Sequence, residues 1–363
     1  PDGTRLMTPF KPGAMGLNAS GVFANFNSSK YSINVNLREP RGKEVVKKLV
    51  QRADIVLETF GPGVMTKLQL DYEVLKQVKQ DIIMLSMTMV GQYGPHSQQP
   101  SFGQVLQATN GFVQLLGWPD RPPSLPVAAY TDFIAPWYVL IALMGALDFR
   151  RRSGKGQYID LAMLEASVHL AAPVVMDYTV NGRIQNRMGN RNPGYAPHGV
   201  YPCKGEERWV AIAVATDEEW QALCKVMGSP EWTKSSKFDT LLHRTENQEE
   251  LDKLMGKWSV NFTPEEVMAK LQSVGVAAGV LQNGEDLVDK DPQMKHRQHF
   301  VRMDHQEMGK HLTERPPFLL SKTPSEPQRP FPSFGEHTEY VCKEILKMGD
   351  AEFAELIGAG VLA

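Results

Sequence analysis

Strand-like and helix-like patterns alternate through the first half of the chain. Residues 32–37 alternate polar and apolar side chains, as a strand with one buried face does. Apolar residues then recur at helical spacing between Val45 and Val50. The predicted elements are, in order, strand 32–37, helix 42–53, strand 55–57, helices 63–70 and 72–78, and strand 82–87. This order predicts an α/β fold in which helices cover a parallel sheet.

A second α/β pattern follows a segment without periodicity. Residues 182–202 are rich in Gly, Asn, Arg and Pro, which predicts a linker between two domains. A helix is predicted over 263–274, because Thr263 and Glu266 have the spacing of a capping box. The other predicted elements are helices 134–150 and 161–181, strand 209–214, helix 218–227, strand 276–281, an extended Pro-rich segment over 312–334 and a short helical tail.

Composition restricts the partners of the protein. The 363 residues include 39 Lys and Arg against 41 Asp and Glu, and a net charge of -2 argues against nucleic acid as a partner. Cys203, Cys224 and Cys342 are too few and too far apart for a disulfide framework or a metal site. They favour a reducing, cytoplasmic location. The longest apolar run, residues 133–147, is shorter than the roughly 20 residues that cross a bilayer, so we expect no membrane partner.

The sequence lacks the common catalytic motifs and leaves single residues as candidates. It contains no P-loop, GxGxxG, GxSxG or HExxH motif. Asp132 lies among small and apolar residues just before an apolar helix in which Pro136 takes an early position. A carboxylate there either caps the helix, or stays ionised in dry surroundings and acts as a nucleophile.

Two kinds of loop offer weaker candidates. Residues 91–95, Gly-Gln-Tyr-Gly-Pro, directly follow a predicted strand, where open α/β sheets bind ligands, although a tight turn explains the same residues. His198 and His337 lie in loops that contain Gly, and an imidazole that titrates near neutrality suits a general base. Neither histidine has a partner visible in the sequence, so a structural role is the alternative for each.

Taken together, several segments resemble the CaiB/BaiF family, the class III coenzyme A transferases and their racemase relatives. Their order and spacing run through nearly the whole chain, and on them the chain is identified as a member of that family. The segments are 32–38, 53–60 with 62–63, 91–95, 131–133, 154–157 with 159–160, and 335–338.

The resemblance implies a Rossmann-like large domain, a smaller α/β domain and an interlocked homodimer. The large domain would take residues 1–185 together with 306–363, which begin with a return linker. Residues 186–204 would link it to the small domain over 205–305. The family's first strand and its Gly-Pro loop would precede Pro1, so we expect the large domain to lack that strand here.

The resemblance also assigns chemistry to Asp132. It implies that this carboxylate attacks an acyl-CoA thioester, forms a mixed anhydride and then an aspartyl-CoA thioester, and passes coenzyme A to an acceptor carboxylic acid. The acyl-CoA and the acid are then substrates, and we expect no tightly bound cofactor and no metal. The residues at the family's CoA contact positions are Val35, Asn36, Arg38, Thr59, Phe60, Gly61, Lys67, Phe102 and Gly103.

Two alternative functions remain open at this stage. An α-methylacyl-CoA racemase needs a base on each face of the α-carbon, and Phe102, which stands where the racemases have a His, cannot accept a proton. The second alternative is an inactive CoA-binding fragment. A Rossmann dehydrogenase would explain the alternating strands and helices, but this chain lacks the GxGxxG motif that such an enzyme uses to bind NAD. Apolar walls for a substrate pocket are suggested by Met87, Met89, Phe102, Tyr130 and Phe133.

Overall fold

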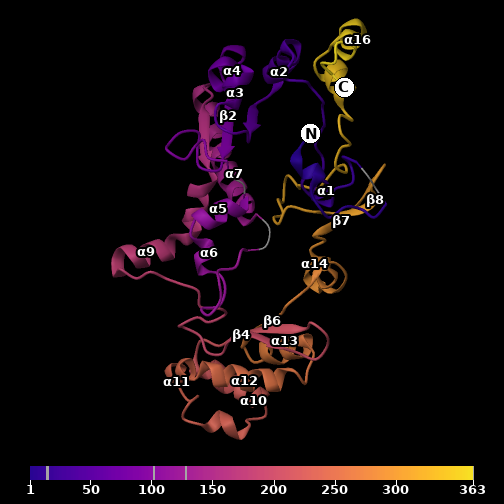
Figure 1. The fold of residues 1–363 in the computed structure, drawn as a ribbon. Helices are drawn as coiled ribbons and strands as arrows, with labels where there is room; N and C mark the ends of the chain where they lie inside the picture. The colour runs from indigo at the N-terminus through magenta and orange to yellow at the C-terminus, as the bar shows by residue number, and fades with distance from the viewer. Residues whose placement is uncertain (14–15, 101–102, 127–128, 363) are drawn as a thin grey trace. The chain divides into compact units, whose positions relative to one another are not determined.

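The computed structural model describes residues 1–13, 16–100, 103–126 and 129–362. The chain forms two compact units. The first comprises Pro1–Leu106, Ala129–His169 and Val288–Ala363, and the second comprises Gln107–Ala128 and Leu170–Leu287. Helices and strands alternate in both, which confirms the predicted mixed α/β fold (Figure 1).

The first unit is built on a parallel sheet with the order β1-β2-β3. Its strands are β1 (Ile55–Glu58), β2 (Ile83–Thr88) and β3 (Tyr158–Ala162), and the helices before and between the first two are α2 (Pro40–Arg52), α3 (Val64–Leu68) and α4 (Tyr72–Val78). All of these except β3 were predicted to within a few residues. Val50, Leu75 and Met84 join the helices to the sheet in one buried cluster.

The strand predicted over 32–37 is wrong. This segment makes only an isolated antiparallel bridge between Val35 and Leu362. The side chain of Val35 packs against a small cluster around Val45 and Cys342. One apolar face is therefore partly buried, as the alternation indicated, but it packs near the end of the chain and forms no ladder with another strand.

Helix α7 (Tyr130–Ser153) is longer than the predicted helix 134–150 and begins before Asp132. Pro136 consequently lies inside the helix and not in its first turn. Among the described residues α7 alone has the length and the mean hydropathy, 1.5, of a membrane span, and 22% of that stretch is buried. The helix is therefore longer than the apolar run of residues 133–147, because it includes further residues at both ends.

The second unit contains an antiparallel sheet with the order β4-β5-β6. The strands are β4 (His198–Pro202), β5 (Trp209–Ala213) and β6 (Ala277–Val280), and α10 (Asp217–Val226), α12 (Gln248–Ser259) and α13 (Pro264–Gln272) pack on one face. Trp220, Leu251 and Ile212 are fully or almost fully buried in this core. The predicted capping box of Thr263 and Glu266 is present at the start of α13.

The unit boundaries differ from the predicted domain boundaries. Residues 186–204 are not all linker, because β4 lies within them; Gly199 and Pro202 obscured the pattern, and an edge strand tolerates such residues. The second unit also includes Gln107–Ala128, and within it the N–H of Gly189 donates to the Gly117 carbonyl at 2.9 Å. The hairpin of β7 (Phe300–His305) and β8 (Gly309–Glu314) belongs to the first unit.

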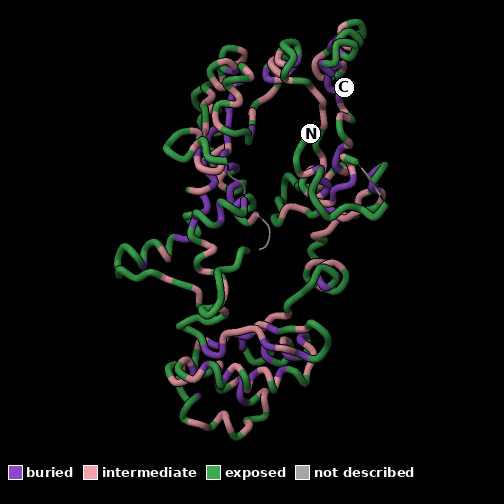
Figure 2. The backbone as a smooth tube through the Cα atoms, viewed as in Figure 1, coloured by how far each residue is buried: buried purple, intermediate pink, exposed green. Residues whose placement is uncertain are grey.

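Most of the remaining elements are short helices. They are η1 (Gly3–Leu6), α1 (Gly21–Phe26), α5 (Gly103–Thr109), α6 (Phe112–Leu115), α8 (Met163–Val168), η2 (His169–Ala171), α9 (Ala172–Asn181), η3 (Glu231–Lys234), α11 (Leu241–Glu246), the π-helix η4 (Asp286–Lys290), α14 (Pro292–His296), α15 (Thr338–Tyr340), the π-helix η5 (Val341–Ile345) and α16 (Asp350–Gly358). Helix α9 is almost entirely exposed (Figure 2).

Gly156 gives a test of the parallel sheet. A Cβ at this position would lie 1.9 Å from the carbonyl oxygen of Ile82, so Gly156→Ala must push β3 away from β2. We expect the free energy of unfolding, measured by urea denaturation, to fall by about 3 kcal/mol. Gly284→Ala is the matched control, because nothing lies within 4 Å of a Cβ there. Equal stability of the two variants would contradict the close approach.

Candidate active site

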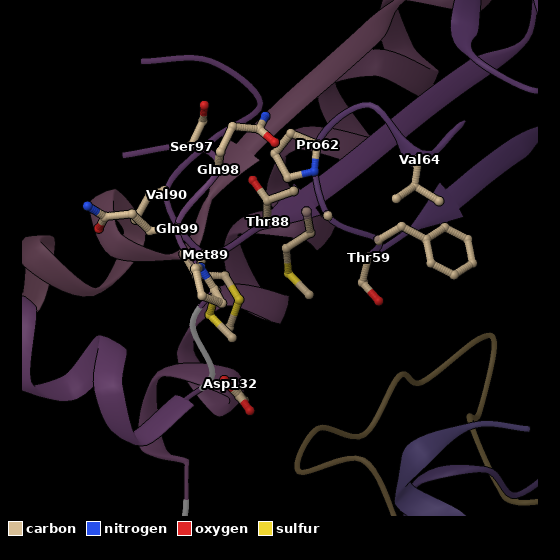
Figure 3. A pocket seen from close by; sticks show the side chains of 15 residues that line it. Thr59, Pro62, Val64, Thr88, Met89, Val90, Ser97, Gln98, Gln99 and Asp132 are labelled. Atoms are coloured by element: carbon tan, nitrogen blue, oxygen red, sulfur yellow. The ribbon is translucent and has the colours of Figure 1, made fainter. Parts of the chain in front are cut away.

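A cavity of about 500 Å³ lies in the first unit at the carboxyl ends of β1 and β2 (Figure 3). Open parallel sheets commonly bind ligands at this edge. The loop after β1 forms one wall, the loop after β2 forms another, and the first turns of α7 and α8 complete it. The lining residues are Thr59, Phe60, Gly61, Pro62, Val64, Met87, Thr88, Met89, Val90, Ser97, Gln98, Gln99, Pro100, Asp132 and Met163.

Asp132 is the ionisable side chain of this cavity. It lies in the first turn of α7, where its N–H donates to the Ala129 carbonyl at 2.8 Å. The Thr131 hydroxyl approaches its Oδ1 at 3.5 Å. The side chain is accessible to solvent, but burial of its surroundings raises the pKa of the carboxyl, and the contact with Thr131 only partly opposes this shift. Because Pro136 has no N–H, it cannot donate the helical hydrogen bond to the backbone carbonyl of Asp132.

Gly103 begins α5 directly beside this carboxylate. A Cβ on Gly103 would lie 2.3 Å from the Cβ of Ala129 and 3.0 and 3.1 Å from the two carboxylate oxygens of Asp132. Only glycine therefore allows α5 to approach α7 so closely at this point. The structure thus brings together two of the residues that the sequence singled out.

Two carboxylates fix the loops that form the cavity walls. Glu58 is buried and accepts the N–H of Phe60 at 2.6 Å. Asp160 accepts the N–H of Gln92 with both oxygens at 3.1 Å. Gly91 adopts φ +91°, which starts the turn of residues 91–95. Asp160 belongs to a segment that the sequence reading had singled out, but its bond to this loop could not be read from the sequence.

The remaining predicted site residues fall into two groups. Thr59, Phe60 and Gly61 line the cavity with Asp132. Four others lie outside its walls: Asn36, Arg38 and Lys67 are exposed, and Val35 packs in the cluster with Val45. Phe102 lies outside the described residues.

Sequence reasoning missed several cavity residues. Met163 and the stretch from Ser97 to Pro100 were not expected, although the stretch directly follows the Gly-Gln-Tyr-Gly-Pro loop. Thr88 is buried, and its hydroxyl has no hydrogen-bond partner within the described ranges. Met87 and Met89 line the cavity as suggested, whereas Tyr130 and Phe133 are half exposed and do not line it.

Both candidate histidines make backbone contacts away from this cavity. His337 accepts the N–H of Ser32 on its Nδ1 at 3.3 Å, and its own N–H donates to the Ser32 carbonyl at 2.8 Å. His198 belongs to the second unit, where its Nδ1 contacts the Asn190 carbonyl. These contacts favour the structural role for each. Over residues 1–13, 16–100, 103–126 and 129–362, no group of three or more His, Cys, Asp or Glu could hold a metal ion.

Comparison with known proteins gives the family. The family model for CoA-transferase family III matches residues 1–338. The chain belongs to this family. The resemblance found in the sequence is therefore confirmed, and the protein is a family III CoA-transferase by both its sequence and its relatives.

Relatives of this transferase cover most of its length. It is 30% identical to the succinyl-CoA–D-citramalate CoA-transferase of Chloroflexus aurantiacus over 90% of this chain and 81% of the relative. It is 28% identical to the human succinyl-CoA:glutarate CoA-transferase, covering 94% and 78% of the two chains. A CaiB/BaiF family protein from Brucella suis has a similar crystal structure, with 30% identity, a TM-score of 0.85 and coverage of 95% and 89%.

The raised pKa of Asp132 predicts how the stability of the transferase depends on pH. Because the folded state holds this proton more tightly than the unfolded state, stability falls as pH rises above the ordinary value of 3.8. Asp132→Asn removes that loss, so its melting temperature should exceed that of the wild type at pH 7 and approach it near pH 4. Differential scanning calorimetry from pH 4 to 8 measures the difference. A less stable variant at pH 7 would mean that the charge at the start of α7 stabilises the helix more than burial destabilises it.

Proposed function

We propose that this transferase moves coenzyme A from an acyl-CoA donor to an acceptor carboxylic acid through covalent intermediates on Asp132. The observation that carries the proposal is that Asp132 is the only ionisable side chain among the described residues that line the cavity. Apolar surroundings leave a carboxylate poorly solvated, and poor solvation makes it a stronger nucleophile.

The proposed reaction conserves the thioester in four balanced steps. An Asp132 oxygen attacks the thioester carbonyl carbon, the C–S bond breaks, and coenzyme A leaves as a thiolate. The thiolate attacks Cγ of Asp132 in the mixed anhydride, which releases the donor acid and forms the aspartyl-CoA thioester. The acceptor carboxylate attacks the same Cγ and again expels the thiolate. The thiolate then attacks the acceptor's acyl carbon, which yields the new acyl-CoA and restores Asp132.

The neighbouring residues suit the binding steps of this scheme. The uncharged hydroxyl and amide groups of Thr59, Ser97 and Gln99 can donate hydrogen bonds to the thioester carbonyl oxygen as it gains negative charge. Arg38 and Lys67 are exposed cations of the kind that hold the phosphates of coenzyme A. We assign the CoA contacts to Val35, Asn36, Arg38, Thr59, Phe60, Gly61, Lys67, Phe102 and Gly103, with no tightly bound cofactor.

The covalent role of Asp132 can be tested by trapping. With an acyl-CoA present, hydroxylamine should convert the activated carboxyl to a hydroxamate on Asp132, found by peptide mass spectrometry. Asp132→Asn should keep its fold and lose transfer by at least about 1,000-fold, because an amide cannot form the anhydride. Glu165→Gln, which alters an acidic side chain outside the cavity lining, is the control that should retain activity. Label on Glu165 or Asp160, with Asp132→Asn still active, would contradict the assignment.

We also propose that the functional form is an interlocked homodimer with a Rossmann-like large domain, located in the cytoplasm. Large exposed apolar surfaces commonly form interfaces, and α7 and α9 both carry exposed apolar side chains. A second copy, and not a bilayer, is the proposed cover of α7. The exposed apolar residues are Phe133, Trp137, Leu140, Ile141 and Met144 on α7, and Val175, Met176, Tyr178 and Val180 on α9.

Sedimentation velocity tests this assembly. We expect the wild type to sediment at about twice its chain mass of 40.5 kDa at micromolar concentration. Ile141→Glu places a charge on a side chain that is 68% exposed in the single chain, and it should release monomers or cause aggregation. Gln221→Glu adds the same charge on the exposed polar side of α10 and should leave the dimer intact. A fully active wild-type monomer, or binding of the wild type to lipid vesicles, would contradict the proposal.

A further inference from the structure

The described residues that line the cavity around Asp132 include no positively charged side chain. Its other described lining residues are apolar, or carry only hydroxyl and amide groups. The seven residues outside the described ranges are Ala14, Met15, Ser101, Phe102, Val127, Ala128 and Ala363, and none of these is a Lys, Arg or His. Neither the described walls nor those undescribed positions therefore supply a cation to this cavity.

This charge pattern determines which acyl groups the cavity accepts. The second carboxylate of a dicarboxylic acid would lose its water in the cavity and gain no ion pair there. It would also lie near the carboxylate of Asp132, and like charges at short range repel each other. Several relatives carry names that specify dicarboxylates such as glutarate, and for the second carboxylate of those substrates the described walls of this cavity offer hydroxyl and amide groups but no cation.

The apolar side chains of the cavity suit an acyl chain without a second charge. Met87, Met89 and Met163 line it together with Val90 and Phe60, and Figure 3 shows Met89 facing the same space as Asp132. Methionine side chains are flexible and adapt to ligands of varied shape. A volume of about 500 Å³ is within the range of sites that enclose small organic ligands.

We propose that the acids between which this enzyme transfers coenzyme A are apolar monocarboxylates with an aliphatic or aryl chain, and not dicarboxylates. The inference rests on the proposed function, since the acyl group must sit beside Asp132. The exchange itself is unchanged: one thioester C–S bond breaks, another forms, and the donor leaves as a carboxylate.

The first experiment compares acceptors that differ in one group. Hexanoate and adipate have six carbons each, and adipate carries a second carboxylate in place of a methyl group. With butyryl-CoA as donor and product esters read by mass spectrometry, kcat/KM for hexanoate should exceed that for adipate by at least 100-fold. Equal rates, or a preference for adipate, succinate or glutarate, would overturn the inference while leaving CoA transfer established.

A second experiment measures the preference without turnover. S-hexyl-CoA and S-(5-carboxypentyl)-CoA are thioethers, so they lack the carbonyl that Asp132 would attack. Titration calorimetry on the wild-type enzyme at pH 7 should show at least 30-fold tighter binding of the hexyl compound. The same thioether preference with no transfer to any acid would refute the proposed function, and only the preference of the cavity for an apolar chain would remain. Equal affinities would refute the inference whatever the turnover.

A charge introduced into the cavity gives the reciprocal test. Met89→Lys should reduce the discrimination against adipate at least tenfold, because an ammonium group then faces the second carboxylate. Met89→Gln has a similar length without the charge and should keep the preference for hexanoate. An equal loss of preference in both variants would show that shape, and not charge, excludes adipate, and would overturn the argument. If neither variant folds, the wild-type thioether affinities still decide.

Discussion

A row of polar side chains across the parallel sheet is the constraint on which the candidate site depends. The register pairs Glu58 with Ser86 and Ser86 with Asp160, so the three residues form one row near the carboxyl ends of the strands. The two carboxylates of this row each accept a backbone N–H from a cavity loop, at Phe60 and at Gln92. Glu58 is buried and Asp160 is half-buried, and a carboxylate withdrawn from water is costly when it is unpaired, so these bonds hold both loops where the strands end. Strand pairing thereby fixes the walls around Asp132.

The sequence was sufficient for elements whose signals are local. Helix α13 has its capping box, and β1 and β2 are short apolar runs between helices, so each could be predicted from its own residues. Strand β4 was missed because Gly199 and Pro202 are poor strand residues that only an edge position tolerates. Residues 32–37 had a correct alternation, but their partner is Leu362, and no local pattern reveals a contact over such a separation.

The same limit applies to the site. Asp132 could be identified from its apolar surroundings, whereas Thr59 to Gly61 and Gly103 came only from resemblance to a family. Met163 and Thr88 required the fold itself, since they reach the cavity from different strands and helices. The boundary of α7 also mattered: with its start at Tyr130, Asp132 lies within the first helical turn, so the helix positions the carboxylate and its dipole acts on it. Burial raises the pKa of this carboxyl, and the contact with the Thr131 hydroxyl opposes the shift only in part.

Nucleophile and substrate class are linked through this balance of charge. A Lys or Arg placed in the cavity close to Asp132 to bind a second carboxylate would also attract the carboxylate of Asp132. Such a cation would lower the pKa of Asp132 and make its oxygens weaker nucleophiles. A site specific for dicarboxylates must therefore keep its cation away from the attacking group. In this chain the problem does not arise within the described cavity walls, where Asp132 is the single charge. The surroundings that raise the pKa of Asp132 would also disfavour a second carboxylate, so a single property of the cavity would account for both the proposed reactivity and the proposed selectivity.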